Sequence, residues 1–242
     1  MSSPELISCP DLTEIRARFP ALRREVAGAP AVYLDGPGGS QVPQTVASAV
    51  ADYLIAANAN SDGPFATSQA TDRLLHDARR AAAGFLGCAT EEVVFGANTT
   101  TINFLLAHAL SRTLSPGDEI IVTELDHDAN VAPWLLVAAD RGLVVRTAPL
   151  VPDDGTLDIT ALEGLISSRT RVVACTLASN AVGSVTDVPR VAAAAHACGA
   201  LLWVDGVHLA PHRRLDRTDL GADVLLTSAY KYFGPHVGVA AV

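Results

Sequence analysis

The sequence has no cluster of basic residues. Its 17 lysines and arginines stand against 26 aspartates and glutamates, for a formal net charge of −9, and arginine pairs such as Arg79-Arg80 and Arg213-Arg214 are scattered. A nucleic-acid-binding domain needs basic side chains gathered on one face. We therefore expect no nucleic-acid partner.

Cysteine is scarce and never paired at short range. No C-x-x-C motif occurs among the four cysteines, Cys9, Cys88, Cys175 and Cys198. This spacing argues against a disulfide framework and against a zinc site, and it is typical of proteins of the reducing cytoplasm. We expect a cytoplasmic protein without a bound metal.

Long uninterrupted apolar runs are also missing. The longest, Val191 to Val204, is broken by His196 and Gly199, so it predicts a helix followed by a strand rather than a membrane span. The amino-terminal stretch Met1–Glu5 has neither a basic nor an apolar region of the kind that a signal peptide needs. We expect no signal peptide and no membrane association.

Aromatic residues make up only 5% of the 242 residues, although 49% are hydrophobic. An apolar fraction dominated by alanine, valine and leucine suits helices packed closely on a mostly parallel sheet. Short apolar runs alternate with alanine-rich helical stretches, which indicates an α/β protein with parallel strand pairing. The predicted strands are Val93–Phe95, Glu119–Thr123, Val144–Thr147, Arg171–Leu177, Ala200–Val204 and Val224–Thr227, and the predicted helices are Thr100–Arg112, Pro133–Arg141, Thr160–Ser167 and Val188–Cys198.

Two local signals bear on element ends. Thr160 with Glu163 has the spacing of a helix-capping box. The final stretch, Gly238–Val242, has the composition of a strand that has just begun, which favours a fragment of a longer protein.

The most informative motif is Ser228-Ala229-Tyr230-Lys231, which follows a predicted strand directly. A second predicted strand ends in Asp205-Gly206-Val207-His208. A lysine amine and a strand-end carboxylate in one sheet are the groups that pyridoxal phosphate requires. The amine holds the aldehyde as a Schiff base, and the carboxylate keeps the pyridine nitrogen protonated.

Polar side chains follow three further predicted strands. Gly96–Thr101 opens a helix with free N–H groups suited to a phosphate, His127 is able to lie flat on an aromatic ring, and the amide of Asn180 is able to bond a phenolic oxygen. Each alone is more often an ordinary helix cap, a surface histidine or a turn residue. Ligands of open α/β sheets bind at the carboxyl ends of the strands, so the five strand ends together indicate one cofactor site.

These motifs make the chain recognisable. It resembles the class V, fold-type I pyridoxal phosphate enzymes, which include cysteine desulfurases, selenocysteine lyases and kynureninases, and among them the cysteine desulfurase-like subfamily. The resemblance is carried by Phe19–Leu22, Tyr33–Gly39, Asn58–Asn60, Gly96–Thr100, Asp205–His208 with Pro211-His212, and Ser228–His236.

The resemblance implies catalytic roles for three residues. Lys231 matches the Schiff-base lysine that also shuttles protons at the substrate α-carbon. Asp205 matches the partner of the pyridine nitrogen, and His127 matches the histidine stacked on the ring. The implied cofactor is pyridoxal 5′-phosphate.

The resemblance also implies cofactor contacts. Asn98, Thr99 and Ser228 fall on the phosphate cup, and Asn180 lies near the phenolic oxygen. His208 takes a place often held by glutamine beside the ring oxygen. Tyr230 stands where better-known desulfurases have a histidine before the lysine.

The implied architecture is a three-layer large α/β domain with a seven-stranded, mostly parallel sheet. We expect it over residues 31–242, after an amino-terminal segment of residues 1–30. The small carboxyl-terminal domain of the resembling enzymes, which supplies a carboxylate-binding arginine and a sulfur-accepting cysteine, has no counterpart here. Cys175 and Cys198 are both expected to be buried.

The implied function is a desulfurase-type or selenocysteine lyase-type reaction on an amino acid, in a homodimer. An aminotransferase, an epimerase and a truncated non-catalytic remnant remain alternatives. Two other readings are weaker. Asp35–Gly39, after the strand-like Ala31–Leu34, lacks the spacing of a dinucleotide fingerprint, and Pro211 separates His208 from His212 in any metal site.

Overall fold

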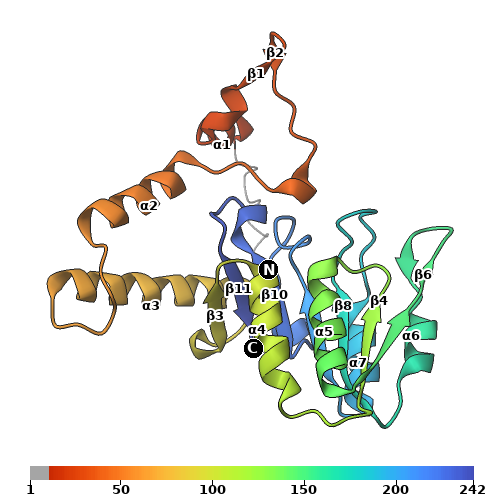
Figure 1. Ribbon diagram of the computed structural model, residues 1–242. Coiled ribbons are helices and arrows are strands. Elements are labelled where there is room, and N and C mark those ends of the chain that lie inside the picture. The colour runs from red at the N-terminus through yellow and green to blue at the C-terminus, as the bar shows by residue number, and fades with distance from the viewer. Residues whose placement is uncertain (1–10) are drawn as a thin grey trace, which may run out of the picture.

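The computed structural model describes residues 11–242, so Cys9 and the Met1–Glu5 stretch lie outside the described residues. A seven-stranded sheet with the strand order β3-β11-β10-β9-β8-β4-β5 forms the centre of the molecule (Figure 1). Only β11 runs antiparallel to its neighbours, which confirms a mostly parallel sheet. The strands are β3 (Val93–Gly96), β4 (Glu119–Thr123), β5 (Val144–Ala148), β8 (Thr170–Thr176), β9 (Leu201–Asp205), β10 (Val224–Ser228) and β11 (Gly238–Ala241).

Helices cover both faces of this sheet (Figure 1). On one face, α4 (Thr99–Ser111) and α5 (Ala132–Arg141) pack on Ile120 and Val122 of β4. On the other, the intervening Ile121 faces a larger core. Because side chains alternate along a strand, each strand feeds both cores, and the three-layer prediction is confirmed. The second face is covered by α3 (Ala66–Leu86), α6 (Ile159–Leu165), α7 (Val188–Ala197) and α8 (Arg217–Leu220).

All six predicted strands and all four predicted helices are present, with ends shifted by up to two residues. The predicted capping box of α6 is wrong. Asp158 caps this helix, because its carboxylate accepts a hydrogen bond from the backbone N–H of Ala161 at 2.8 Å. Thr160 therefore lies inside the first turn, and Glu163 instead pairs with Arg190 at 2.7 Å.

The last strand in the sequence, β11, lies inside the sheet, between two strands that come earlier in the chain. β11 pairs with β10 on one side and β3 on the other, and Gly238 lies opposite Gly96 of β3. A Cβ on Gly238 would lie 2.4 Å from the carbonyl carbon of Asn98. The glycine therefore lets the start of β11 lie directly against the start of α4.

A buried carboxylate ties the amino ends of β4, β5 and β8 together. The side chain of Glu119 is fully buried, and it accepts bonds from Arg146 at 2.9 Å, Arg169 at 2.7 Å and the hydroxyl of Ser167 at 2.7 Å. These partners, Arg146 first, lower the pKa of Glu119 to about 2. The cluster lies at the end of the sheet opposite the polar strand ends, so its role is structural.

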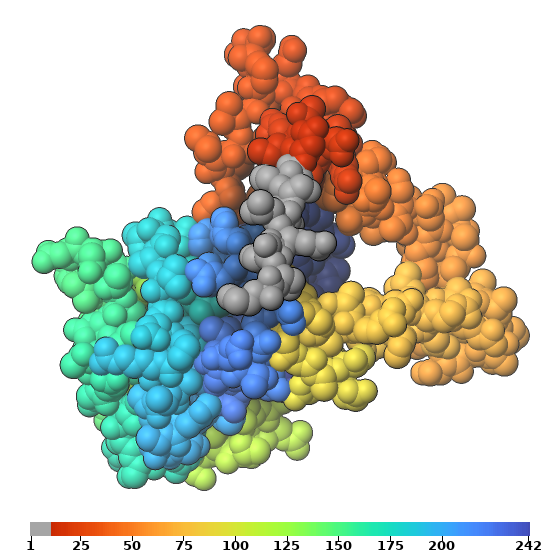
Figure 2. Space-filling model, turned by 180° about the vertical axis from the view of Figure 1, so that it is seen from behind, coloured from red at the N-terminus to blue at the C-terminus, as the bar shows by residue number. Residues whose placement is uncertain are grey.

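Most of the amino-terminal part stands away from the sheet, although the segment around Pro37 and Ser40 contacts η5, and an open space separates α2 (Gln44–Ala56) from the main body (Figure 2). Ala31–Leu34 has no regular structure, which is a correction to its strand-like reading and removes the strand that a dinucleotide site requires. No helix among residues 11–242 has the length and hydropathy that a membrane crossing needs. The remaining elements are α1 (Leu12–Ala17), η1 (Pro20–Arg23), β1 (Glu25–Val26), β2 (Ala29–Pro30), η2 (Gly36–Gly38), η3 (Thr90–Glu92), η4 (Asp128–Asn130), β6 (Leu150–Val151), β7 (Thr156–Leu157) and η5 (Ala229–Lys231).

Candidate active site

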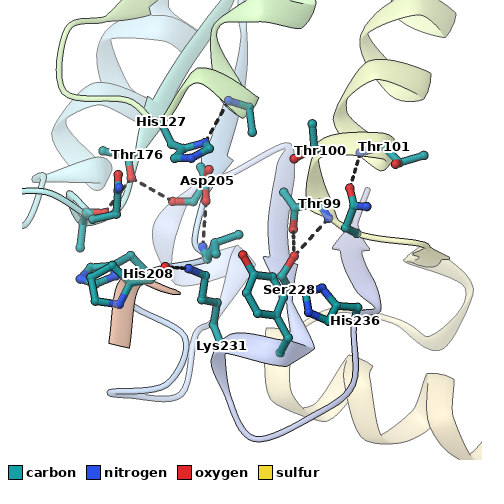
Figure 3. A pocket seen from close by; sticks show the side chains of 17 residues that line it. Thr99, Thr100, Thr101, His127, Thr176, Asp205, His208, Ser228, Lys231 and His236 are labelled. Carbon is teal, nitrogen blue, oxygen red and sulfur yellow. Dashed lines mark hydrogen bonds between the residues drawn. The ribbon is translucent and has the colours of Figure 1, made fainter. Parts of the chain in front are cut away.

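One pocket of about 540 Å³ lies where the carboxyl ends of β8, β9 and β10 meet the amino end of α4 (Figure 3). It brings together every residue that the sequence singled out for a site: Asn98, Thr99, His127, Asn180, Asp205, His208, Ser228, Tyr230 and Lys231. Pro37, Thr176 and His236 also line it, and sequence reasoning did not select them.

At one end of the pocket, hydroxyl groups surround the first turn of α4. Asn98 caps the helix, since its side-chain oxygen accepts a bond from the N–H of Thr101 at 2.8 Å. Ser228 Oγ accepts the N–H of Thr99 at 3.1 Å and lies 2.7 Å from the Thr99 hydroxyl. Thr99 and Ser228 come from elements 129 residues apart and are both buried. Uncharged hydroxyl and amide groups at a helix amino terminus form a cup that suits an anion.

Asp205 forms the deep part of the other end. It is the last residue of β9 and is 5% exposed, and one carboxylate oxygen accepts the N–H of Val207 at 2.9 Å. Burial raises the pKa of Asp205, while the Val207 bond and the nearby His127 and Lys231 lower it. A buried carboxylate of this kind gains from a positively charged ligand group.

His127 lies above Asp205 in the pocket (Figure 3). Its Nδ1 accepts the backbone N–H of Ala129 at 3.0 Å, so the neutral ring carries its proton on Nε2. Beside it, Asp126 accepts bonds from Thr123 at 2.5 Å and Asn130 at 2.8 Å, and burial raises the pKa of Asp126 to about 7. These bonds hold the loop after β4 and with it the imidazole.

Lys231 is the only lysine of the 242 residues. It ends η5, and its Nζ donates to the carbonyl of Pro37 and lies 4.9 Å from the ring centroid of Tyr230. The segment around Pro37 is anchored over this turn because Ser40 N–H donates to the Tyr230 carbonyl at 2.9 Å, and Ser40 Oγ accepts the N–H of Phe233 at 2.6 Å. The glycine-rich segment around Pro37, Gly36–Gly39, therefore forms one wall of the pocket beside Lys231.

A second cavity of about 640 Å³ adjoins the first and shares Asn180, His208 and Lys231 with it. The rings of His208 and His212 meet edge to face with their centroids 5.9 Å apart. Burial, followed by the charges of His212 and Lys231, lowers the pKa of His208. Lys231 thus stands between the two cavities, near a histidine whose pKa is held below its ordinary value.

The described cysteines lie outside the pocket lining. Cys175 is buried in β8 as predicted, and burial raises its pKa well above the ordinary value. Cys198 is only half-buried, which corrects the expectation that both are buried, because it caps the end of α7 at the surface. Within residues 11–242 no group of three or more histidines, cysteines or carboxylates is arranged to hold a metal ion.

Comparison with known proteins places this pocket in a family. The model of the family "Aminotransferase class-V" matches residues 32–242. The chain is 39% identical over 235 residues to the aminotransferase-like protein FGM3 of Gibberella zeae. This alignment covers 94% of this chain and 56% of that protein. It is 38% identical over 227 residues to a cysteine desulfurase of Pectobacterium carotovorum, which covers 93% of this chain and 56% of the relative. The chain thus spans little more than half the length of these curated relatives.

Solved structures agree with this result. The cysteine desulfurase CsdA of Escherichia coli superposes with a TM-score of 0.83 at 32% identity, over 95% of this chain and 57% of that one. The apo cysteine desulfurase of Thermococcus onnurineus superposes with a TM-score of 0.88 at 30% identity, over 98% of this chain and 58% of that one. Class V aminotransferases and cysteine desulfurases depend on pyridoxal 5′-phosphate. The chain belongs to the class V aminotransferase family and is cysteine desulfurase-like.

Proposed function

We propose that this chain binds pyridoxal 5′-phosphate as a Schiff base at Lys231 and acts on an amino acid by desulfurase-type or selenocysteine lyase-type chemistry. One observation carries the proposal. The only lysine, a buried strand-end carboxylate at Asp205 and the hydroxyl cup of Thr99 and Ser228 face one cavity. The identities to cysteine desulfurases support the choice of reaction class.

The residues of the pocket fit the cofactor in chemical kind. Asn98, Thr99 and Ser228 would hold the phosphate at the amino end of α4. The carboxylate of Asp205, whose raised pKa reflects burial, would pair with the protonated pyridine nitrogen. His127 would lie over the ring, while Asn180 and His208 would contact the phenolic oxygen. Tyr230 would border the phosphate side of the lysine.

When bound, the cofactor supplies an electron-accepting ring that stabilises negative charge at the substrate α-carbon. The chain supplies the proton transfers. The amine of Lys231 lies between two cavities, with one wall made by Pro37, and this position supports a role for it in taking and returning the α-proton. Burial lowers the pKa of His208 nearby, which favours the neutral imidazole, and a neutral imidazole donates a hydrogen bond at one nitrogen and accepts one at the other.

The pocket leaves the choice of the broken bond open between elimination, transamination and epimerisation. To test the proposal, the purified chain is mixed with pyridoxal 5′-phosphate, cysteine and an excess of dithiothreitol, and absorbance, alanine and sulfide are measured. The dithiol takes up the sulfur that leaves cysteine and reduces it to sulfide, while the dithiol itself is oxidised to its disulfide. We expect a Schiff-base band and release of sulfide with alanine. Exchange of the amino group onto a 2-oxo acid would favour the aminotransferase alternative, and racemised substrate the epimerase. A folded chain without the band would contradict the proposal and support the non-catalytic remnant.

We also propose a homodimer in the reducing cytoplasm, where unpaired Cys88, Cys175 and Cys198 are stable. No residue of α2 is buried, and Val50 and Leu54 line an apolar groove together with Leu74 of α3. A second copy of the chain would cover this face, since large exposed apolar patches mark association sites.

Leu54→Glu is therefore expected to convert the dimer into a monomer, because burying an unpaired carboxylate in an apolar interface is unfavourable. Light scattering after size-exclusion chromatography measures the mass. Asp52→Asn, on the same helix, is the control and should stay dimeric. A wild-type chain that is monomeric at all accessible concentrations would contradict the dimer.

A further inference from the structure

The cup at the amino end of α4 lacks a charge to match a phosphate ester. A phosphate monoester carries close to two negative charges at pH 7. The side chains that surround this cup, those of Asn98, Thr99 and Ser228, are uncharged amide and hydroxyl groups. A helix dipole contributes only about half a positive charge at its amino terminus. Some cationic side chain is needed to balance the anion, and this argument rests on the proposed cofactor.

Four residues that line the pocket are able to carry a positive charge, namely His127, His208, Lys231 and His236. Three of them lie toward Asp205. His127 and Lys231 are close enough to lower the pKa of Asp205, and the pKa of His208 is itself lowered by Lys231. Only His236 lies on the side of Ser228 and Thr99 (Figure 3).

The position of His236 is set by its surroundings. Its imidazole stacks on the ring of Tyr230, with centroids 4.4 Å apart and planes 10° from parallel. The loop is held at its base because Ala229 N–H donates to the carbonyl of Val237 at 2.8 Å. Gly238, two residues after His236, lies directly against the backbone of Asn98, an approach that only a residue without a Cβ allows. The imidazole is thus fixed at the cup although it is exposed to solvent.

We propose that His236 is the cationic phosphate ligand of this pocket, with Tyr230 as the platform that orients its ring. Stacking on Tyr230 leaves the ring nitrogens at the edge of the imidazole free of the platform, and a flat cation gains from an aromatic face. His236 is exposed to solvent, so an anion is able to reach its ring. An imidazolium–phosphate pair is a charge-assisted hydrogen bond.

The test compares three probes that differ in the phosphate. Pyridoxal 5′-phosphate, pyridoxal and inorganic phosphate are titrated against wild type, His236→Ala and His236→Lys. Absorbance reports the first two, and thermal unfolding reports phosphate. His108→Ala is the matched control, because His108 is an exposed histidine of α4 that lies in a different surface cavity. We expect His236→Ala to weaken pyridoxal 5′-phosphate by about 10- to 100-fold, which is the range of one charge-assisted bond.

The same variant should bind pyridoxal as wild type does and should lose the stabilisation by inorganic phosphate. His236→Lys should restore most of the phosphate-dependent affinity, and His108→Ala should change nothing. Equal losses for pyridoxal and pyridoxal 5′-phosphate, or no loss for either, would overturn the role of His236 while leaving the proposed function intact. A wild-type chain that binds neither pyridoxal 5′-phosphate nor phosphate would overturn both.

Discussion

Lys231→Ala is expected to abolish the Schiff-base absorption band that pyridoxal 5′-phosphate forms with the wild-type chain. The sequence contains no other lysine, so no second side-chain amine can take over the linkage. Reduction with borohydride followed by intact-mass measurement should add one cofactor to wild type and none at a side chain of the variant. The expected loss is complete rather than graded, because the covalent bond has no substitute.

Lys231→Arg is the matched variant, since it keeps a positive charge beside Tyr230 and the Pro37 carbonyl but is unable to form the imine. It should bind the cofactor non-covalently and show no borohydride-trapped adduct. Because Lys231 is only half-buried, both variants should unfold at temperatures near that of wild type. A trapped adduct in either variant, away from the chain's α-amine, would show that the assignment of Lys231 is wrong.

Asp205→Asn is expected to leave the Schiff-base band in place while slowing α-proton exchange by more than about 100-fold, the usual effect of removing one group that stabilises developing charge. Without a carboxylate the pyridine nitrogen is no longer held protonated, so the ring accepts electrons less well. Deuterium incorporation at the α-carbon of an amino acid, followed by NMR, measures this directly. The readout does not depend on sulfur transfer.

Asp223→Asn is the control for Asp205→Asn. Its carboxylate binds the N–H of Leu202 at 2.7 Å and the ring of His196 at 2.9 Å, and it does not line the pocket. We expect exchange in this variant within a few-fold of wild type. Exchange at the wild-type rate in Asp205→Asn would mean that the carboxylate does not act on the ring nitrogen.

Much of this molecule could be predicted from local patterns. The apolar runs that form β4, β8, β9 and β10 fill both cores of the sheet, so the apolar composition of these runs was enough to predict that they are buried. Parallel strands bring their carboxyl ends to one edge, and this rule alone was enough to place Asp205 and Lys231 in one pocket. The capping box of α6 failed because Asp158 offered a competing cap two residues earlier.

Three features of the site were decided by tertiary structure. The carbonyl of Pro37 meets Lys231 across 194 residues of sequence, and a backbone oxygen has no residue-specific signature. Thr176 lines the pocket because β8 ends there, one residue before the predicted strand end. His236 faces the cup because Gly238 lets β11 lie against Asn98.

The sequence by itself determined which strands form, which of their ends carry polar groups, and that a single lysine is available for imine chemistry. Only the tertiary structure decided what surrounds that lysine: the Pro37 wall, the second cavity and the imidazole on Tyr230. The physical reason is range. Hydrophobic periodicity is a relation between residues close together in the sequence, so it is visible in the sequence itself. Contacts between loops join residues far apart in the sequence, and they depend on where the folded sheet positions the end of each strand.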